Sequence, residues 1–88
     1  MEKTNQILEM LRIIIENIVD DREAIVIEHG TDTIGEFVSV SVAPEEVGKV
    51  IGKQGRTADA IRIILKATST KDAKGMFLKI LQPLKTNE

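Results

Sequence analysis

The strongest constraint on the fold is a pair of glycines that interrupts an otherwise helical stretch. Gly52 and Gly55 stand in the segment Val-Ile-Gly-Lys-Gln-Gly-Arg, residues 50–56. Glycine costs roughly 1 kcal/mol relative to alanine inside a helix, and it adopts backbone conformations that other residues avoid. The chain therefore has to turn here, and we expect two helices, 45–51 and 56–67, joined by a four-residue loop. A further glycine inside the first of these helices, Gly48, indicates a close contact at that point.

A helix is also predicted at the start of the chain. Its apolar residues recur at helical spacing from Thr4, the expected N-cap, to about Val19, where two aspartates supply a turn. At about 100° per residue these side chains fall on one face. The apolar positions are Ile7, Leu8, Leu11, Ile14, Ile15 and Ile18. We therefore expect an amphipathic helix over 4–19.

Three short segments have strand character. Residues 24–28 and 76–81 are rich in β-branched or other large apolar side chains, and residues 37–42 show the clearest alternation in the chain. Gly30 and Gly35 lie between the first two segments and are typical of a hairpin loop. The alternation predicts that Val38, Val40 and Val42 face inward and that Ser39 and Ser41 face outward.

The resulting order of elements is α-β-β-α-α-β. It predicts an α+β fold in which a three-stranded sheet has its helices packed on one face. The first two strands form an antiparallel hairpin, whereas the third returns after a two-helix crossover and is expected to pair in parallel. The 88 residues suffice for one core only. We expect a single domain over residues 1–82 and a frayed C-terminal tail over 83–88.

The composition excludes several classes of function. The chain has no cysteine, which removes disulfides, zinc knuckles and thiol nucleophiles. Its one histidine, His29, has no recognisable partner, so we predict no enzyme, no metal site and no cofactor. The aliphatic run Ile13–Ile15 is far shorter than the roughly 20 residues of a membrane span. The first residues also lack the layout of a signal peptide. We therefore expect a cytoplasmic protein with no membrane contact.

The charges are divided unequally along the chain. Residues 1–46 carry three basic and eleven acidic side chains, whereas residues 47–88 carry nine basic and three acidic ones. Such asymmetry indicates one side that faces a polyanion and an opposite acidic side. The alternative, in which the two sets neutralise each other in the fold, remains open at this stage.

The glycine loop has the chemistry of an anion site. Glycines remove the Cβ atoms that would keep a phosphate away, and the N–H groups at the start of the following helix add partial positive charge. Lys53 and Arg56 supply full charges, and Lys49 lies one turn upstream. A helix–loop–helix corner that binds nothing is the alternative reading of the same spacing.

Two well-known nucleotide-binding loops do not fit this spacing. A Walker A loop needs four residues between its first glycine and the Gly-Lys pair, but only three separate Gly48 from Gly52, and Gln54 follows where Ser or Thr is required. A dinucleotide fingerprint needs a glycine at position 50, which is Val50. Both nucleotide readings are therefore excluded.

The flanking residues give the loop a more specific meaning. Val-Ile-Gly-Lys-Gln-Gly-Arg between two helices, in this order of elements, resembles the signature of the KH domain. Residues 42–56 as a whole are similar to the small bacterial KH-domain proteins of the KhpA type, which have the type II KH arrangement. The resemblance implies an RNA-binding protein that clamps about four nucleotides of single-stranded RNA and acts as a post-transcriptional regulator or RNA chaperone. It implies that Gly52, Lys53, Gln54 and Gly55 grip the backbone, and the charges of Arg56 and Lys49 add these two residues to the predicted RNA-binding site. Val50, Ile51 and the following helix would then line a groove that has the second strand on its other side.

The helix over 56–67 is too apolar for one sheet to cover. Only Asp59, Arg62 and Lys66 interrupt its apolar surface after the first turn. We expect the apolar surface that the sheet leaves uncovered to line a groove or to form an interface that includes Ile61, Ile63 and Leu65. A helix buried deeply in the core would have the same sequence pattern and is the alternative. The resemblance implies a homodimer, a second and larger KH-containing RNA-binding protein as partner, or both. A protein–protein adaptor that uses this helix and a vestigial loop is the alternative function.

Overall fold

The computed structural model describes residues 2–68 and 75–81, with side chains from residue 5 onward. Its helices and strands are α1 (Glu2–Glu16), β1 (Val26–Thr31), β2 (Glu36–Ser41), α2 (Val47–Ile51), α3 (Arg56–Ala67) and β3 (Phe77–Ile80). Short 3-10 turns precede β1, α2 and α3. The predicted α-β-β-α-α-β order is confirmed, and the predicted tail over 83–88 lies outside the described residues. In the described part of the chain, no helix is both long and apolar enough to cross a membrane.

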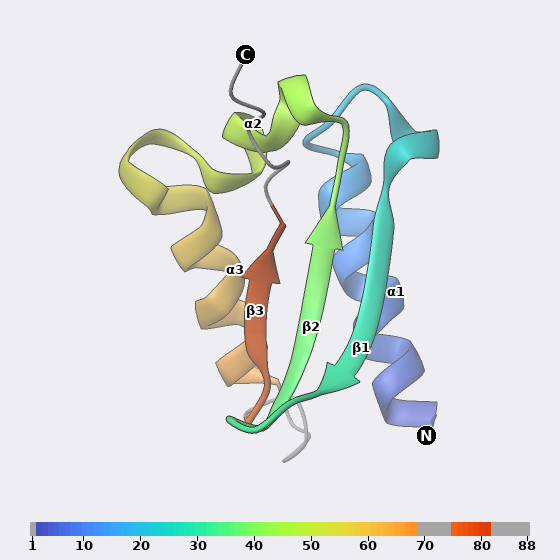
Figure 1. Cartoon of the computed structure of the whole chain (residues 1–88). Coiled ribbons are helices and arrows are strands. Elements are labelled where there is room, and N and C mark those ends of the chain that lie inside the picture. The colour runs from blue at the N-terminus through green and yellow to red at the C-terminus, as the bar shows by residue number, and fades with distance from the viewer. Residues whose placement is uncertain (1, 69–74, 82–88) are drawn as a thin grey trace.

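The three strands form one mixed sheet in the order β1-β2-β3 (Figure 1). β1 pairs with β2 in antiparallel fashion, from Val26 opposite Ser41 to Thr31 opposite Glu36. β2 pairs with β3 in parallel, with Phe37 opposite Phe77. Both predicted pairings are confirmed, and β2 is the central strand.

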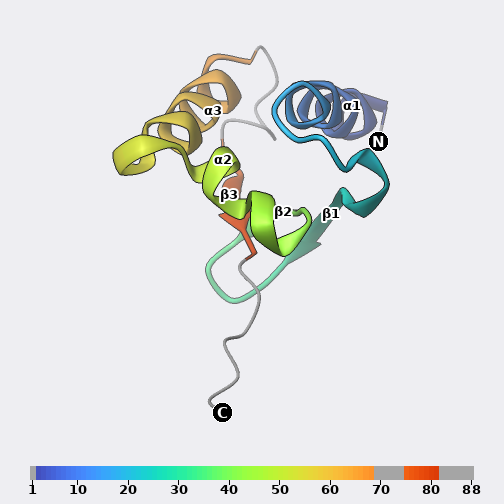
Figure 2. The same ribbon diagram turned by 90° about the horizontal axis from the view of Figure 1, so that it is seen from above.

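The helices lie on one face of this sheet. Seen from above, α1 and α3 stand side by side behind the strands, and α2 lies over the end of the sheet where β2 stops (Figure 2). The other face of the sheet carries no helix of the described chain. The predicted layering is therefore confirmed.

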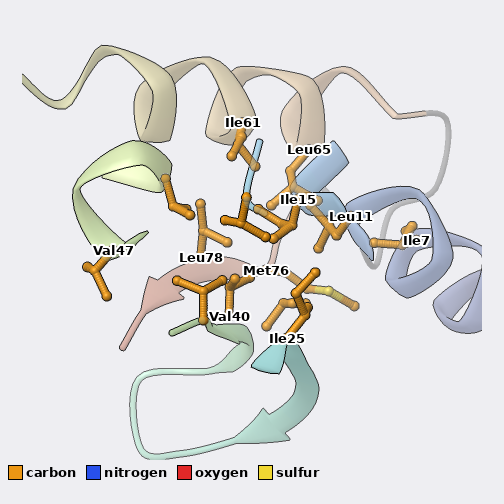
Figure 3. Close-up of a cluster of buried hydrophobic side chains, with 14 residues drawn as sticks. Ile7, Leu11, Ile15, Ile25, Val40, Val47, Ile61, Leu65, Met76 and Leu78 are labelled. Atoms are coloured by element: carbon orange, nitrogen blue, oxygen red, sulfur yellow. The ribbon is translucent and has the colours of Figure 1, made fainter. Parts of the chain in front are cut away.

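The core fills the space between the sheet and the two long helices (Figure 3). Leu11 and Ile15 of α1 and Leu65 of α3 meet the inward valines of β2, and all of these side chains are almost completely buried. Each such side chain contributes roughly 1.5–3 kcal/mol through its removal from water. Among the residues that the structure describes, the buried core is aliphatic apart from Met76.

The first helix differs from its prediction at both ends. It begins at Glu2, so Thr4 lies within its first turn rather than capping it. It ends at Glu16, three residues early, because the side-chain amide of Asn17 donates a hydrogen bond to the carbonyl oxygen of Ile13 at 2.7 Å. An asparagine side chain that takes a helical carbonyl favours the end of the helix. The chain then turns before β1.

The first two strands also differ in detail from their predictions. β1 starts at Val26 and continues through Gly30 to Thr31, and the Phe37 ring of β2 packs over that glycine. A Cβ on Gly30 would lie only 2.6 Å from Phe37 Cζ. Ser39 faces outward as predicted, but it is only 6% exposed. It lies on the central strand between Glu28 of β1 and Lys79 of β3, its partners on the flanking strands.

Candidate nucleic-acid interface

The loop between α2 and α3 begins with a backbone conformation that favours glycine. Gly52 has a φ of +81°, and its N–H donates to the carbonyl oxygen of Gly48 at 2.8 Å, which ends α2. A Cβ on Gly52 would lie 2.6 Å from the Cβ of Thr57 in the first turn of α3, and closer still to Thr57 Oγ1. Conformation and space therefore both require glycine at position 52.

The rest of the loop is a tight turn with left-handed backbone. Gln54 has φ +58° and ψ +27°, and it is the one non-glycine residue with positive φ among those the structure describes. Gly55 follows with φ +77°, and its N–H donates to the carbonyl oxygen of Gly52 at 3.1 Å. A Cβ on Gly55 would meet no atom within 4 Å. The turn therefore exposes Lys53 and Gln54 and leaves the backbone open to approach at Gly55.

The cations near the loop differ in how freely they can meet an anion. Lys53 and Arg56 are exposed, and neither forms an ion pair within the described residues. Lys49 instead donates to a carboxylate oxygen of Asp20 and one of Glu46, both at 3.3 Å. These two carboxylates, Glu46 first, raise the pKa of Lys49 above its ordinary value. The positive charge of Lys49 is therefore largely balanced by these two carboxylates of the same chain.

The family model described as "KhpA/KhpB, KH domain" matches residues 8–80. The chain belongs to the KhpA/KhpB family of KH domains. It is 40% identical over 75 residues to the RNA-binding protein KhpA of Caldanaerobacter subterraneus subsp. tengcongensis, covering 83% of this chain and 97% of that one. The RNA-binding proteins KhpA of Clostridium perfringens and Listeria monocytogenes are also 40% identical, over 76 and 75 residues, covering 83% and 84% of this chain and 97% of each relative. No solved structure matches the chain.

In this KH domain Lys53, Gln54 and Arg56 lie on the surface beside the two glycines of the loop. Val50, an apolar residue predicted beside them, is not on that surface. Val50 has no exposed surface and packs in the core beneath the loop. Our prediction that it lines a groove is wrong, because α2 is a single short helix whose inward side must close the end of the sheet. Ile51 is partly buried against the same core and retains some exposed surface.

The predicted interface on α3 is reduced in the same way. Ile61 and Leu65 are 3% and 1% exposed and pack against the sheet, so they are core residues and the prediction that they form an interface is wrong. Ile63 is 66% exposed and Ile64 is 41% exposed. The apolar surface of α3 is therefore divided between the core and a narrower exposed strip.

The strand beside α3 is β3 rather than the predicted β2. β2 is central in the sheet, and β3 is the edge strand on the α3 side (Figure 1). A cavity of about 390 Å³ lies between the second half of α3 and the start of β3. Arg62 and Lys66 line it beside apolar side chains, and Arg62 also pairs with Asp59 at 3.2 Å. The sequence placed both cations on the polar strip of the helix but gave no reason to assign them to a groove.

Gly48 was expected to mark a close contact, and that prediction is wrong. It is exposed, and a Cβ at this position would meet no atom within 4 Å. The missing side chain leaves open surface on α2 next to Lys49. Of Gly48 within α2 and Gly52 at its end, only Gly52 is required by the fold.

A buried carboxylate that sequence reasoning missed fixes the base of α2. Glu46 is 4% exposed, and its carboxylate accepts hydrogen bonds from the backbone N–H groups of Asp20 and Asp21, at 2.6 and 2.9 Å. These bonds, with a smaller contribution from Lys49, lower the pKa of Glu46 below its ordinary value. The partners lie 25 and 26 residues earlier in the chain, so no local pattern could have revealed them.

We predict that this carboxylate makes the fold sensitive to acid. A lowered pKa stabilises the folded chain above the unfolded value of about 4.5, and the stabilisation disappears as the pH falls from there through the folded value. Glu46→Gln removes this titrating group. We therefore expect the Tm of the wild type to exceed that of the variant near pH 6 and the difference to shrink towards about pH 3. Thermal unfolding followed by circular dichroism measures both curves, and two parallel curves would contradict the assignment.

Proposed function

We propose that this chain binds single-stranded RNA through the Gly52–Gly55 loop, without strong sequence preference and without catalysis. The observation that carries the proposal is the geometry of the loop. The positive φ angles of Gly52 and Gly55 hold Lys53 and Gln54 on the surface, and the backbone at Gly55 is open to approach. The proteins most similar to the chain in the comparisons above are named RNA-binding proteins, which supports the same function.

In this proposal the protein backbone at Gly55 approaches the sugar-phosphate backbone, because no side chain separates them. Lys53 and Arg56 neutralise phosphates, and the amide of Gln54 can both donate and accept hydrogen bonds. The bases then lie towards Ile51 and the space between α3 and β3, where apolar surface is flanked by Arg62 and Lys66. Single-stranded RNA fits this arrangement better than a duplex, since its bases are free to leave the backbone and enter such a groove.

The charges imply weak, salt-dependent binding by one chain. Within the described residues, Lys53 and Arg56 are the cations at the loop that form no ion pair, and the whole chain carries a net charge of −2. Each phosphate neutralised on a single strand adds about 0.7 to the slope of log affinity against log salt concentration. A post-transcriptional regulator in the cytoplasm that acts through this loop would gain affinity from a second RNA-binding unit. That unit would be a second copy of the chain or a larger KH-containing protein.

The two lysines on either side of Gly52 test the proposal. We expect Lys53→Gln to lower the salt slope of RNA binding by about 0.7, whereas Lys49→Gln leaves the slope nearly unchanged because its charge is already balanced. Fluorescence anisotropy of a short labelled single-stranded RNA at several salt concentrations gives the slopes. Equal slopes for Lys53→Gln and the wild type would place the RNA away from this loop.

A further inference from the structure

The sheet has an open edge at β1. Within the described residues, only β2 pairs with this strand. In Figure 1, β1 forms the border of the sheet away from α3, and α1 passes behind it. An edge strand presents a row of backbone N–H and C=O groups that have no partner in their own sheet, and such a row can pair with another extended chain.

The hydrogen bonds of the hairpin identify the backbone groups of β1 that point outward. The N–H of Asp32 donates to the carbonyl oxygen of Gly35 at 3.0 Å, so these two residues form a hydrogen-bonded pair. Such pairs alternate with non-hydrogen-bonded pairs along an antiparallel ladder. The register then makes Ile27, His29 and Thr31 the non-hydrogen-bonded residues of β1. Their N–H and C=O groups are therefore directed towards the free edge.

The contacts of β2 agree with this assignment. Val40 is opposite Ile27, and its carbonyl oxygen accepts a hydrogen bond from the N–H of Leu81, on the β3 side, at 2.9 Å. The backbone of Val40 therefore faces β3 and not β1, as a non-hydrogen-bonded pair requires. Each of the three outward residues of β1 thus offers one donor and one acceptor to a new strand.

β1 lacks the features that commonly protect an edge strand. It contains no proline and no lysine, and its register with β2 runs from Val26 to Thr31 without a bulge. Val26, at its start, is 47% exposed. The opposite edge strand, β3, carries Lys79. An unprotected edge with exposed apolar surface indicates a strand that can accept a partner.

The charges around β1 indicate the kind of partner. Residues 20–36 contain six carboxylates and one arginine, and two of the carboxylates pair with lysines outside this stretch. Glu28 on β1 and Glu23 in the turn before it are exposed and form no ion pair within the described residues. A basic partner is therefore favoured. A second copy of the chain is disfavoured, because it would bring the same carboxylates to this edge.

We propose that the free edge of β1 binds an extended, basic segment of another protein, which adds to the sheet as a fourth strand. The segment runs antiparallel to β1, the slightly more stable arrangement per residue. Its residues opposite Ile27 and His29 exchange backbone hydrogen bonds with β1. The residue between them lies opposite Glu28, on the face of the sheet without helices, where a lysine or arginine meets the carboxylate.

The segment therefore alternates basic and apolar side chains. Its apolar residues lie on the helix side, next to Ile27, which packs against the core. The segment needs only an extended conformation and not a folded RNA-binding domain, so the inference does not rest on RNA binding. The Gly52–Gly55 loop stays free, because it lies beside α3, at the opposite edge of the molecule (Figure 1). When both sites are occupied, the chain brings the second protein to the RNA.

N-methylation of alternate residues in a probe peptide tests the pairing. The probe is fluorescently labelled Val-Lys-Val-Lys-Val-Lys with blocked ends, and fluorescence anisotropy measures its binding. In the proposed strand the valine N–H groups face β1 and the lysine N–H groups face away from it. We therefore expect N-methylation of the valines to weaken binding at least about tenfold, whereas N-methylation of the lysines changes it by less than about twofold.

Two variants of the protein test the same edge independently. His29→Pro removes an outward N–H but keeps the hydrogen bonds to β2, since an edge strand tolerates proline where its N–H faces solvent. Glu28→Lys sets like charges opposite each other. We expect either change to weaken binding of the probe at least about tenfold, with an unchanged circular dichroism spectrum. Glu45→Lys, the same charge reversal in the turn before α2, is the matched control and should leave binding within about twofold of the wild type.

Several outcomes would overturn the proposal. They are a wild type that does not bind the probe, equal binding of the two methylated peptides, and tighter binding of the valine-methylated one. Equal loss in Glu45→Lys and Glu28→Lys would mean attraction to net charge only and would also overturn it. So would a His29→Pro variant that is monomeric in sedimentation-velocity ultracentrifugation where the wild type is dimeric, because a second copy would then occupy the edge. If His29→Pro does not fold, Glu28→Lys and the methylated peptides decide the question.

Discussion

The double substitution Lys53→Asp with Gln54→Asp is expected to abolish RNA binding while the fold stays intact. Both side chains are exposed, and neither makes a side-chain hydrogen bond within the described residues. The change replaces one cation with two carboxylates at the place where a phosphate would sit. Repulsion then replaces attraction, and we expect affinity to fall by at least about a hundredfold at low salt.

A gel-shift assay with single-stranded RNA at low salt measures this loss, and thermal unfolding checks the fold. A matched control is Gln6→Glu with Arg22→Asp, which changes the net charge of the chain by the same amount. Arg22 belongs to the short turn that precedes β1. In Figure 1 this turn is at the edge of the molecule next to β1, whereas the loop is at the opposite edge next to α3. RNA that is retained equally by the loop variant and the wild type would refute the proposed site.

The second large effect is expected on stability, from Gly52→Ala. Alanine at this position would have to keep a φ of +81° and would bring its Cβ within 2.6 Å of the Thr57 backbone nitrogen. Backbone strain and overpacking each cost about 1–3 kcal/mol, so we expect a loss of about 3 kcal/mol in the free energy of unfolding. Urea unfolding followed by circular dichroism measures this value.

Gly48→Ala is the control, because it makes the same chemical change four residues earlier. Gly48 lies within α2, and the added methyl group would meet nothing within 4 Å. Alanine is the better helix former, so we expect this variant to be more stable than the wild type by about 0.5–1 kcal/mol. Two variants of similar stability would show that the loop does not hold the conformation described here.

The general architecture could be predicted because local patterns and connection lengths determine it. The alternation over 37–42 marked a half-buried strand, the short glycine-containing loop implied an antiparallel hairpin, and the two-helix crossover implied the parallel pairing of β3. The loop was predictable for a similar reason. Two glycines three residues apart destabilise a helix enough to end it, and the residues between them are then expected on the surface.

The groove and the interface were less predictable, because they depend on how helices are rotated against the sheet. The apolar arc of α3 is wide enough that several rotations would bury it equally well. The sequence alone therefore could not separate Ile61, which is in the core, from Ile63, which is exposed. Val50 was misassigned because its position beside the loop suggested surface. The role of Glu46 was missed because its carboxylate is bound by the backbone N–H groups of Asp20 and Asp21. Contacts so far apart in the sequence leave no periodic pattern.

The central position of β2 has a consequence for the order in which the chain folds. β2 meets β1 across only four residues, but about 35 residues separate it from β3. Closing the longer loop costs more chain entropy, so the hairpin can nucleate early, while docking of β3 has to wait until α2 and α3 have formed the crossover. The same ordering applies in reverse when the native state opens locally. We therefore expect the β3 edge, which borders the α3 side on which the candidate groove lies, to separate before the β1–β2 hairpin does.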